Sequence, residues 1–315
     1  MTALARRPLG SSGIEVTELS LGSWRTYERI PRDAGIAVMQ TAREQGINFL
    51  DDARYNDESG TAPIKSGYSE VVFGELFRAS GWKRDEVVLA NKLWWEFWPE
   101  ESAEAELEGS LRRMGMDYLD LVYAEKPRNG QQIEQMVRDI GALIVAGKLR
   151  AWGVLNWPAG EIVVAARIAA EEGVPPPCAA QLAYSLVRRS PVEDPDMVDA
   201  LGAAGASVVA SYSLDGGALT GKYAVPGAEG RVTAGLDHRD YGPGMRAADE
   251  LRGLAERSRA RPAALAIAFA LLNPRVASVL FGATNPEQVI ENVSAARLRF
   301  SMDAQNVAAL RRIGA

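Results

Sequence analysis

Residues 119–155 read LDLVYAEKPRNGQQIEQMVRDIGALIVAGKLRAWGVL, and the fold class follows from their pattern. The stretch begins with an apolar run at 119–124 that predicts a buried strand, and it ends with a similar run at 151–155. Between them, residues 131–146 carry apolar side chains at the spacing of an amphipathic helix. A strand, a helix and a second strand in this order are the repeating unit of parallel α/β folds.

The same alternation runs along the whole chain. The predicted strands are residues 18–21, 47–50, 86–90, 119–124, 151–155, 179–183, 207–211 and 277–281. The predicted helices are 32–44, 69–78, 102–114, 131–146, 159–172, 194–204, 245–258, 262–272, 286–295 and 303–313, with a long Gly-rich loop at 214–244. Eight strands, each followed by a helix and with no linker between them, predict a single (β/α)8 TIM barrel domain over residues 1–315.

The alternative α/β fold is an open, doubly wound sheet. That fold usually carries Gly-x-Gly-x-x-Gly after its first strand, whereas this chain has GSWRT at 22–26. A second decoy is GGALTGK at 216–222, which matches part of a P-loop. A P-loop needs Ser or Thr at the next position to hold Mg²⁺, and Tyr223 stands there, so we do not expect ATP hydrolysis.

Composition argues against several classes of protein. The 315 residues are 47% apolar and 24% charged, which allows a large core. Lys and Arg number 35 against 41 Asp and Glu, a net charge of −6, so nucleic acid is not an expected partner. No apolar run of about 18 residues and no signal-peptide pattern occur. We expect a cytoplasmic protein that does not bind membranes, either a monomer or a homo-oligomer, with a small-molecule substrate.

The cysteine and histidine counts exclude other chemistry. Cys178 is the one cysteine, and it follows three prolines at the start of an apolar run. We expect it to be buried as a small apolar residue. His238 is the one histidine and lies in a polar loop, where we expect a surface residue. No Cys/His cluster could hold zinc, so no metal is expected.

Polar side chains follow the predicted strands, at the end of a barrel where active sites lie. Asp51 and Tyr55 follow the second strand, Lys92 the third and Glu125 the fourth. Further polar residues near strand ends are Asp52, Arg54, Asn91, Lys126, Asn156, Gln181, Tyr184, Tyr212 and Ser213. The fold therefore predicts one ring of polar groups around the mouth of the barrel.

Asp51, Tyr55 and Lys92 together indicate acid catalysis. A phenol loses its proton near pH ~10, a nearby ammonium lowers that pKa, and a carboxylate holds the ammonium in place. The phenol can then give a proton to a carbonyl that is receiving hydride from a nicotinamide. Each residue alone has a plainer explanation as a helix cap or a solvated charge. Their convergence is what favours a site.

Five motifs in this order resemble the aldo-keto reductase family, and within it the branch that contains the voltage-gated potassium channel beta subunits. They are LGSSGIEV at 9–16, GINFLD at 46–51, EVVFG at 70–74, LDLVYAEKP at 119–127 and GATNPEQ at 282–288. The resemblance implies a catalytic Asp, Tyr, Lys and His. Asp51 and Lys92 match the first and third, with Asp52 as a second candidate for the aspartate. Tyr55 is the expected tyrosine, one residue earlier than the family usually has it, and Tyr68 competes with it.

Glu125 stands where the resemblance implies the catalytic histidine. A carboxyl group can donate a hydrogen bond to a carbonyl oxygen only while it is protonated, which requires a raised pKa. A Glu here resembles the steroid 5β-reductases, which reduce an activated C=C bond. The alternative is that Glu125 merely pairs with Lys126 or another cation. Reduction of C=O and of C=C both stay open.

The resemblance also implies NADPH as cofactor, without excluding NADH. Asn156 and Gln181 would hold the nicotinamide carboxamide, and Tyr212 would stack on its ring. The residues expected to hold the rest of the dinucleotide are Ser213, Leu214, Gly217, Leu219, Thr220, Lys222, Gly282, Thr284, Gln288, Glu291 and Asn292. The aromatic cluster of Trp94, Trp95, Phe97 and Trp98 follows Lys92. Trp24, Trp94 and Trp95 are expected to form an apolar substrate wall.

The sequence thus predicts an oxidoreductase that moves hydride from NADPH to an aldehyde, a ketone or an activated C=C bond. A nicotinamide-sensing binding or regulatory protein with weak turnover is the second hypothesis.

Overall fold

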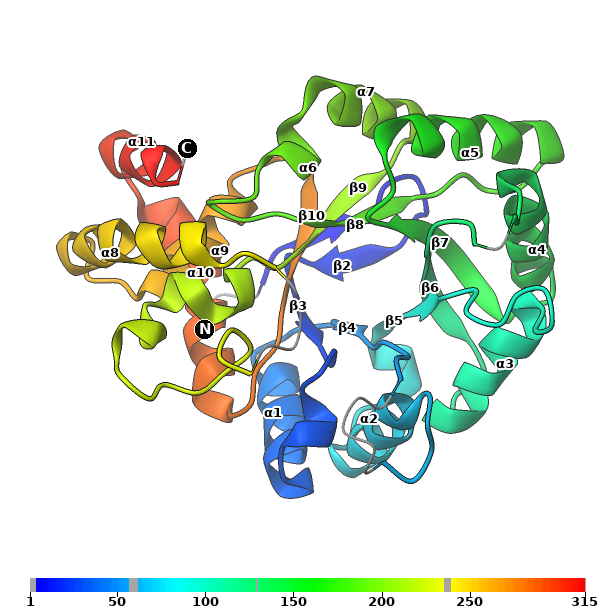
Figure 1. Cartoon of the computed structure of the whole chain (residues 1–315), viewed down its shortest axis with the longest axis horizontal. Coiled ribbons are helices and arrows are strands. Elements are labelled where there is room, and N and C mark those ends of the chain that lie inside the picture. The colour runs from blue at the N-terminus through cyan, green and yellow to red at the C-terminus, as the bar shows by residue number, and fades with distance from the viewer. Residues whose placement is uncertain (1–3, 57–61, 129, 235–238, 315) are drawn as a thin grey trace.

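A closed barrel of eight parallel strands forms the centre of the computed structural model, which describes residues 4–56, 62–128, 130–234 and 239–314. The strands follow one another around the ring in the order β10-β3-β4-β5-β6-β7-β8-β9 (Figure 1). Their bounds are β3 (Leu19–Gly22), β4 (Phe49–Asp51), β5 (Val88–Leu93), β6 (Leu119–Ala124), β7 (Leu149–Leu155), β8 (Ala179–Ala183), β9 (Ser207–Ser211) and β10 (Val276–Phe281). The predicted TIM barrel is confirmed.

Helices connect the strands and cover the outside of the ring. In Figure 1, α1 to α5 and α7 follow one another around it. Their bounds are α1 (Arg32–Glu44), α2 (Tyr68–Ala79), α3 (Ala103–Met114), α4 (Ile133–Val145), α5 (Ala159–Glu172), α6 (Ser190–Glu193), α7 (Pro195–Ala204), α8 (Gly242–Arg257), α9 (Pro262–Leu271), α10 (Pro286–Ser301) and α11 (Ala304–Arg312). Short 3-10 helices occur at Tyr27–Arg29, Arg84–Glu86, Asp215–Thr220 and Lys222–Ala224.

Local sequence fixes several helix ends. The Ser102 hydroxyl accepts a hydrogen bond from the Ala105 backbone N–H at 3.2 Å, which satisfies one of the free donors in the first turn of α3. At the other end Gly115 adopts a left-handed conformation with φ of 69°, which costs glycine little. The Asn285 side chain likewise accepts from the Gln288 backbone N–H and begins α10. These caps set where each helix starts relative to the strand before it.

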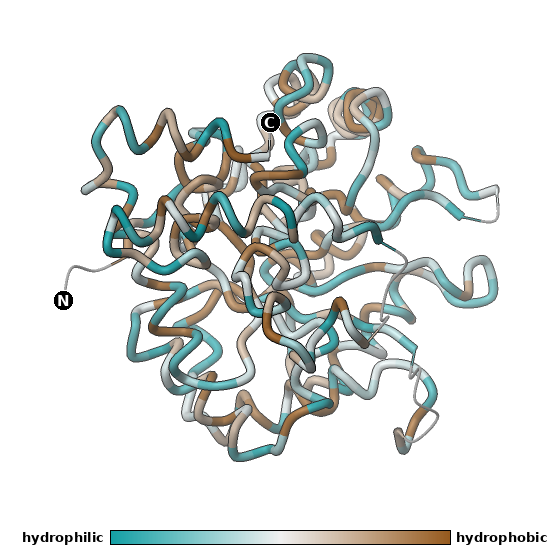
Figure 2. The backbone as a smooth tube through the Cα atoms, turned by 60° about the vertical axis from the view of Figure 1, so that its left-hand side comes forward, coloured by the Kyte–Doolittle hydropathy of each residue, from teal (hydrophilic) through white to brown (hydrophobic). Residues whose placement is uncertain are grey.

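Apolar side chains pack in two clusters. The larger lies between the barrel and its helices, and α9 contributes nine buried residues to the protein interior, Ala263 to Leu271. The smaller cluster includes Phe49, Leu121 and Tyr123 from the barrel strands. Figure 2 shows the same division, with hydrophobic segments in the middle and hydrophilic ones in the outer loops.

The sequence analysis missed an antiparallel hairpin, β1 (Arg6–Pro8) paired with β2 (Glu15–Thr17). In Figure 1 it lies across the middle of the ring, and Leu9, Ile14 and Val16 join the smaller apolar cluster. Its three-residue strands are too short to show periodicity. The predicted loop at 214–244 was also too long, because 3-10 turns occupy its start and α8 begins at Gly242.

Two expectations about individual features can be compared with the structure. Cys178 is buried, as predicted, with 2% of its surface exposed. Burial raises the pKa of its thiol to about 12, so the thiol is protonated and unreactive at neutral pH. Within the described ranges, no helix has both the length and the apolar character needed to cross a membrane.

Candidate active site

A buried ion pair joins the ends of two neighbouring strands. Asp51 is the last residue of β4, and Lys92 is the fifth residue of β5. The Lys92 ammonium contacts Asp51 Oδ1 and donates a second hydrogen bond to the Asp52 carbonyl oxygen at 2.8 Å. The two side chains are 3% and 5% exposed. Removing either partner would leave a buried charge uncompensated, which costs about 3–5 kcal/mol.

The second oxygen of Asp51 is also occupied. Gln181, the third residue of β8, donates from Nε2 to Asp51 Oδ2 at 2.8 Å. The Lys92 ammonium also lies 5.3 Å from the centre of the Tyr123 ring, inside the barrel. The carboxylate of Asp51 is thus held by two groups from different strands, and its orientation is fixed.

Sequence reasoning did not single out Tyr123. It lies on the inside of β6, in the same small cluster as Leu121, and burial raises its pKa well above the ordinary value. The period of two along a strand would have indicated it, because Leu121, Tyr123 and Glu125 alternate with outward-facing residues.

Asp52 does not take the role of Asp51, although it was a second candidate. Its carboxyl group is fully buried and contacts the Ser23 hydroxyl through Oδ1, while Oδ2 has no partner among the described residues. Burial, with a smaller effect of the Glu70 carboxylate, raises the pKa of Asp52 to about 8. At neutral pH this group is therefore mostly neutral, and only its backbone carbonyl contacts Lys92.

Tyr55 lies in the segment after β4, but its hydroxyl faces the segment after β3. Its oxygen accepts a hydrogen bond from the Arg25 backbone N–H at 2.9 Å. Burial raises the pKa of Tyr55 far above its ordinary value, and the nearby carboxylate of Glu28 raises it further. The sequence analysis expected Lys92 to lower this pKa, whereas in the structure burial and the Glu28 carboxylate raise it.

Two other tyrosines considered from the sequence lie elsewhere. The Tyr68 hydroxyl accepts from Arg32 Nη2 of α1 at 3.0 Å, and Arg32 also pairs with Glu75 of α2. The Tyr184 hydroxyl donates to Glu193 of α6 at 2.6 Å. The pKa of Tyr55, by contrast, responds to the carboxyl group of Asp52, next to Asp51 in the chain.

Glu125 follows β6 directly, and both of its backbone polar groups make hydrogen bonds. Its N–H donates to the Leu93 carbonyl at 2.9 Å, and its carbonyl accepts from Trp95 Nε1 at 3.2 Å. Its carboxylate, 21% exposed, pairs with Arg128 Nη2 at 3.5 Å. The cation beside Glu125 is therefore Arg128 rather than Lys126.

The aromatic residues after Lys92 divide into buried and accessible ones. Glu106 accepts hydrogen bonds from the backbone N–H groups of Trp94 and Trp95, at 2.6 and 3.0 Å, and fixes this segment. Trp95 is 1% exposed and packs in the core. It therefore does not form part of an open substrate wall, whereas Trp94 and Trp24 are half-buried.

Trp24 and Tyr212 lie together at the ends of β3 and β9, with ring centres 5.9 Å apart and planes tilted by 60°. Arg231 stacks on Trp24 at 4.4 Å and donates to its carbonyl, and Arg239 lies 4.0 Å from the Tyr212 ring centre. Asn156, expected near the carboxamide, is exposed at the end of β7 and has a positive φ of 53°. Its N–H donates to the Gln181 carbonyl at 3.0 Å. This hydrogen bond joins the two residues that were expected to hold the nicotinamide carboxamide.

The segment after Tyr212 forms consecutive 3-10 turns rather than a long helix. Gly216 and Gly217 have φ of 66° and 90°, conformations that suit glycine. The Thr220 hydroxyl donates to the Gly217 carbonyl at 2.7 Å, and Lys222 Nζ to the Glu229 carbonyl at 3.2 Å. A Cβ at Gly217 would lie 3.3 Å from Lys222 Cε, so glycine keeps room beside the ammonium. Ser213 and Leu219 are buried and Leu214 is half-buried, so these three support the turns.

The residues expected around the adenosine lie at the start of α10. Gln288 Oε1 accepts from the backbone N–H of Thr284 at 2.8 Å, and both residues are exposed, as is Gly282. Glu291 is half-buried and Asn292 is buried one turn further along. A cation, exposed backbone amides and the start of a helix are groups that suit the phosphates of a dinucleotide. His238 lies outside the described residues.

Known proteins resemble this chain over most of its length. A model of the Aldo/keto reductase family matches residues 18–315. A protein of Oryza sativa subsp. japonica named "Probable voltage-gated potassium channel subunit beta" is 32% identical over 303 residues, 91% of this chain and 89% of the relative. A protein of Schizosaccharomyces pombe, likewise named as a candidate voltage-gated potassium channel subunit beta, is 32% identical over 308 residues, 92% of this chain and 87% of the relative. This chain belongs to the aldo/keto reductase family.

Proposed function

We propose that the protein is an NADPH-dependent reductase of small apolar or aromatic aldehydes, ketones or activated alkenes, built as one domain over the whole chain. Family membership supports an oxidoreductase with an NADP-type cofactor. The observation that carries the proposal is the buried Lys92–Asp51 pair, which joins the ends of β4 and β5 and is held by Gln181 of β8. Burial of a charged pair costs desolvation free energy. Buried ionisable groups in a barrel mouth are therefore typical of functional sites.

The dinucleotide is held by the residues grouped around the strand ends. Asn156 and Gln181 bind the carboxamide, Tyr212 packs against the nicotinamide ring, and Lys222 with the neighbouring turns binds the phosphates. Thr284 and Gln288 lie exposed at the start of α10, where the positive end of the helix dipole suits a 2′-phosphate. NADH is the alternative cofactor, and relative KM values for the two would decide between them. The bound nicotinamide supplies the hydride.

Tyr55 supplies the proton. Its phenol is protonated at neutral pH, which is the state that a proton donor needs, and its raised pKa makes it a weaker acid than a phenol in water. The phenolate left after transfer is balanced by the ammonium of Lys92, and Asp51 holds that ammonium. Trp24 and Trp94, both half-buried, provide the apolar surface against which the substrate lies.

Glu125 positions the substrate in this proposal. Its carboxyl group, bound to Arg128, occupies the strand end next to Lys92. A protonated carboxyl could donate to the substrate oxygen, and an ionised one would repel developing negative charge on that oxygen. Its protonation with substrate bound would therefore bias reduction between C=O and C=C.

The test is NADPH oxidation with a panel of aldehydes, quinones and enones. We expect Tyr55→Phe and Lys92→Met to lower kcat by at least about a hundredfold, since general acids contribute about 10²–10⁴-fold. Binding of NADPH, followed by fluorescence, and the far-UV circular dichroism spectrum serve as controls for folding. Full turnover in both variants would contradict the assignment of Tyr55 and Lys92.

A second candidate function is a nicotinamide-sensing binding protein with weak turnover. Two observations favour it. Both relatives are named as voltage-gated potassium channel beta subunits, and burial and Glu28 make Tyr55 a weak acid. It predicts tight NADPH binding with turnover that stays slow across the substrate panel. Rapid turnover of any substrate in the panel would exclude it.

A further inference from the structure

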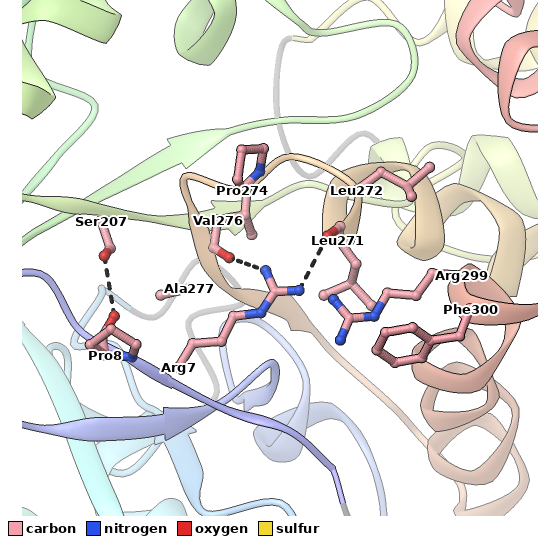
Figure 3. A pocket seen from close by; sticks show the side chains of 10 residues that line it. All are labelled: Arg7, Pro8, Ser207, Leu271, Leu272, Pro274, Val276, Ala277, Arg299 and Phe300. Atoms are coloured by element: carbon pink, nitrogen blue, oxygen red, sulfur yellow. Dashed lines mark hydrogen bonds between the residues drawn. The ribbon is translucent and has the colours of Figure 1, made fainter. Parts of the chain in front are cut away.

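A pocket of about 510 Å³ opens at the end of the barrel opposite to Asp51 and Lys92. Ser207 and Val276, the first residues of β9 and β10, line it together with residues of β1, α9 and α10. Figure 3 shows Arg7, Arg299 and Phe300 around it. Its volume lies within the usual range of about 300–1,000 Å³ for small-molecule sites.

The charge at this pocket is unbalanced. The two charged residues that line it, in the described part of the chain, are both arginines, Arg7 and Arg299. Both guanidinium groups contact the same oxygen, Oε2 of the buried Glu18, with the Arg7 contact at 3.5 Å. Two cations therefore share one carboxylate, which leaves one positive charge without a counterion in this cluster.

The two arginines differ in how well their donors are satisfied. Arg7 also donates to the carbonyls of Val276 and Leu271, the latter at 3.2 Å, so it ties the hairpin to the barrel. Arg299 is 10% exposed, and its Nε has no hydrogen-bond partner among the described residues. A buried guanidinium donor without an acceptor destabilises the folded protein. Of the two arginines, Arg299 is thus the one with a donor left unsatisfied, and the exposed tenth of its side chain lines the pocket.

Apolar side chains lie beside the guanidinium of Arg299. Phe300 is 76% exposed, and the Arg299 guanidinium lies 4.2 Å from the centre of its ring. Leu272 and Pro274 line the same pocket. A guanidinium stacked on an aromatic ring is suited to a planar anion that carries an apolar body, since the fork binds the oxygens and the ring covers the body.

We propose that this pocket binds a small organic monoanion, a carboxylate with an aromatic or aliphatic body. The carboxylate neutralises the surplus charge at Arg299 and Arg7, with its oxygens on the guanidinium of Arg299. The apolar body packs against Phe300, Leu272 and Pro274. The site lies apart from the residues of the proposed reduction, so its occupancy does not depend on that function.

Benzoate is the probe, and benzamide is its neutral counterpart of nearly equal shape. Saturation-transfer NMR and calorimetric titration are run on the full chain saturated with NADPH. We expect saturable binding of benzoate and much weaker binding of benzamide. Arg299→Gln should weaken benzoate binding about tenfold, the loss of a hydrogen bond to a charged group. Phe300→Ala should weaken it about threefold to tenfold through the lost ring contact.

Arg252→Gln is the matched control, because Arg252 is an exposed arginine of α8 that pairs with Asp249 outside the pocket. It should leave benzoate binding unchanged. If Arg299→Gln does not fold, Phe300→Ala still decides, since the exposed ring contributes little to the core. Benzoate binding that neither Phe300→Ala nor a folded Arg299→Gln weakens would overturn the proposal. Equal binding of benzamide, or no saturable binding of benzoate, would do the same.

Discussion

The amide of Gln181 donates a hydrogen bond of 2.8 Å to the carboxylate of Asp51, across 130 residues of sequence. Gln181 was expected at the cofactor and Asp51 in proton chemistry, so this contact joins the two parts of the proposed site. Because Lys92 contacts the other oxygen of Asp51, a change at Gln181 reaches the lysine through one shared carboxylate.

We therefore predict that Gln181→Leu lowers kcat as well as raising the KM for NADPH. Loss of a hydrogen bond to a charged group corresponds to about tenfold to a hundredfold in rate. The matched control is Asn156→Ala, which removes an exposed amide that does not contact Asp51. It should raise KM and leave kcat close to that of the wild type. Equal kcat values for the two variants would show that the Gln181–Asp51 contact does not affect the chemical step.

Glu125→His tests the role of the carboxyl group in selectivity. With an α,β-unsaturated ketone as substrate, we expect the fraction of allylic alcohol to rise, because a neutral imidazole donates to the carbonyl oxygen without needing a raised pKa. Product ratios by chromatography are the measurement. Arg128→Gln removes the cation at 3.5 Å and keeps the carboxyl group. It serves as the control for a mere loss of the ion pair. An unchanged product ratio in Glu125→His would argue that Glu125 only pairs with Arg128.

Glu28→Gln should make Tyr55 a stronger acid. The Glu28 carboxylate adds to the effect of burial in raising the pKa of Tyr55, so replacing it by a neutral amide lowers that pKa. The rates of the variant should lie above those of the wild type across the pH–rate profile. Where proton transfer limits the rate, kcat should rise by roughly twofold to fivefold, because only part of a pKa change is transmitted to the rate.

The control for this prediction is Glu44→Gln, which removes an exposed carboxylate at the end of α1. It should leave the pH–rate profile in place. A profile that is the same for Glu28→Gln and the wild type would mean that Glu28 does not act on the reacting phenol.

Asp52 predicts a pH dependence of stability. Its pKa is raised to about 8 in the folded protein and is about 3.9 when unfolded. The folded state therefore keeps this proton when the unfolded state has lost it. The contribution of Asp52 to stability is present in full below about pH 4 and is lost as the pH rises through about 8.

Asp52→Asn removes this proton linkage. Relative to the wild type, the variant should gain stability progressively between about pH 4 and pH 8 and keep a constant difference above that range. Urea unfolding at several pH values measures the difference. A difference in unfolding free energy that does not vary with pH would mean that Asp52 is ionised in the folded protein.

The predicted elements agree best with the structure where local patterns are strong. Helix 32–44, strand 119–124 and helix 159–172 have the predicted bounds, because apolar periodicity and end signals lie in the same short segments. The hairpin β1–β2 was missed because its strands are three residues long. Its buried residues, Leu9, Ile14 and Val16, pack against a barrel end built from distant strands.

The barrel fold, and the strand ends that carry Asp51, Lys92 and Glu125, could be predicted from the sequence alone. Both features follow from local apolar periodicity and from the repetition of one strand–helix unit. The contacts of these side chains could be read only from the folded structure. Gln181 reaches Asp51, Glu28 and Arg25 surround the Tyr55 hydroxyl, and Arg128 rather than Lys126 pairs with Glu125. Burial of Trp95 and the raised pKa of Asp52 were decided in the same way. Contacts, burial and charge depend on segments that are remote in the chain, and no local pattern records them.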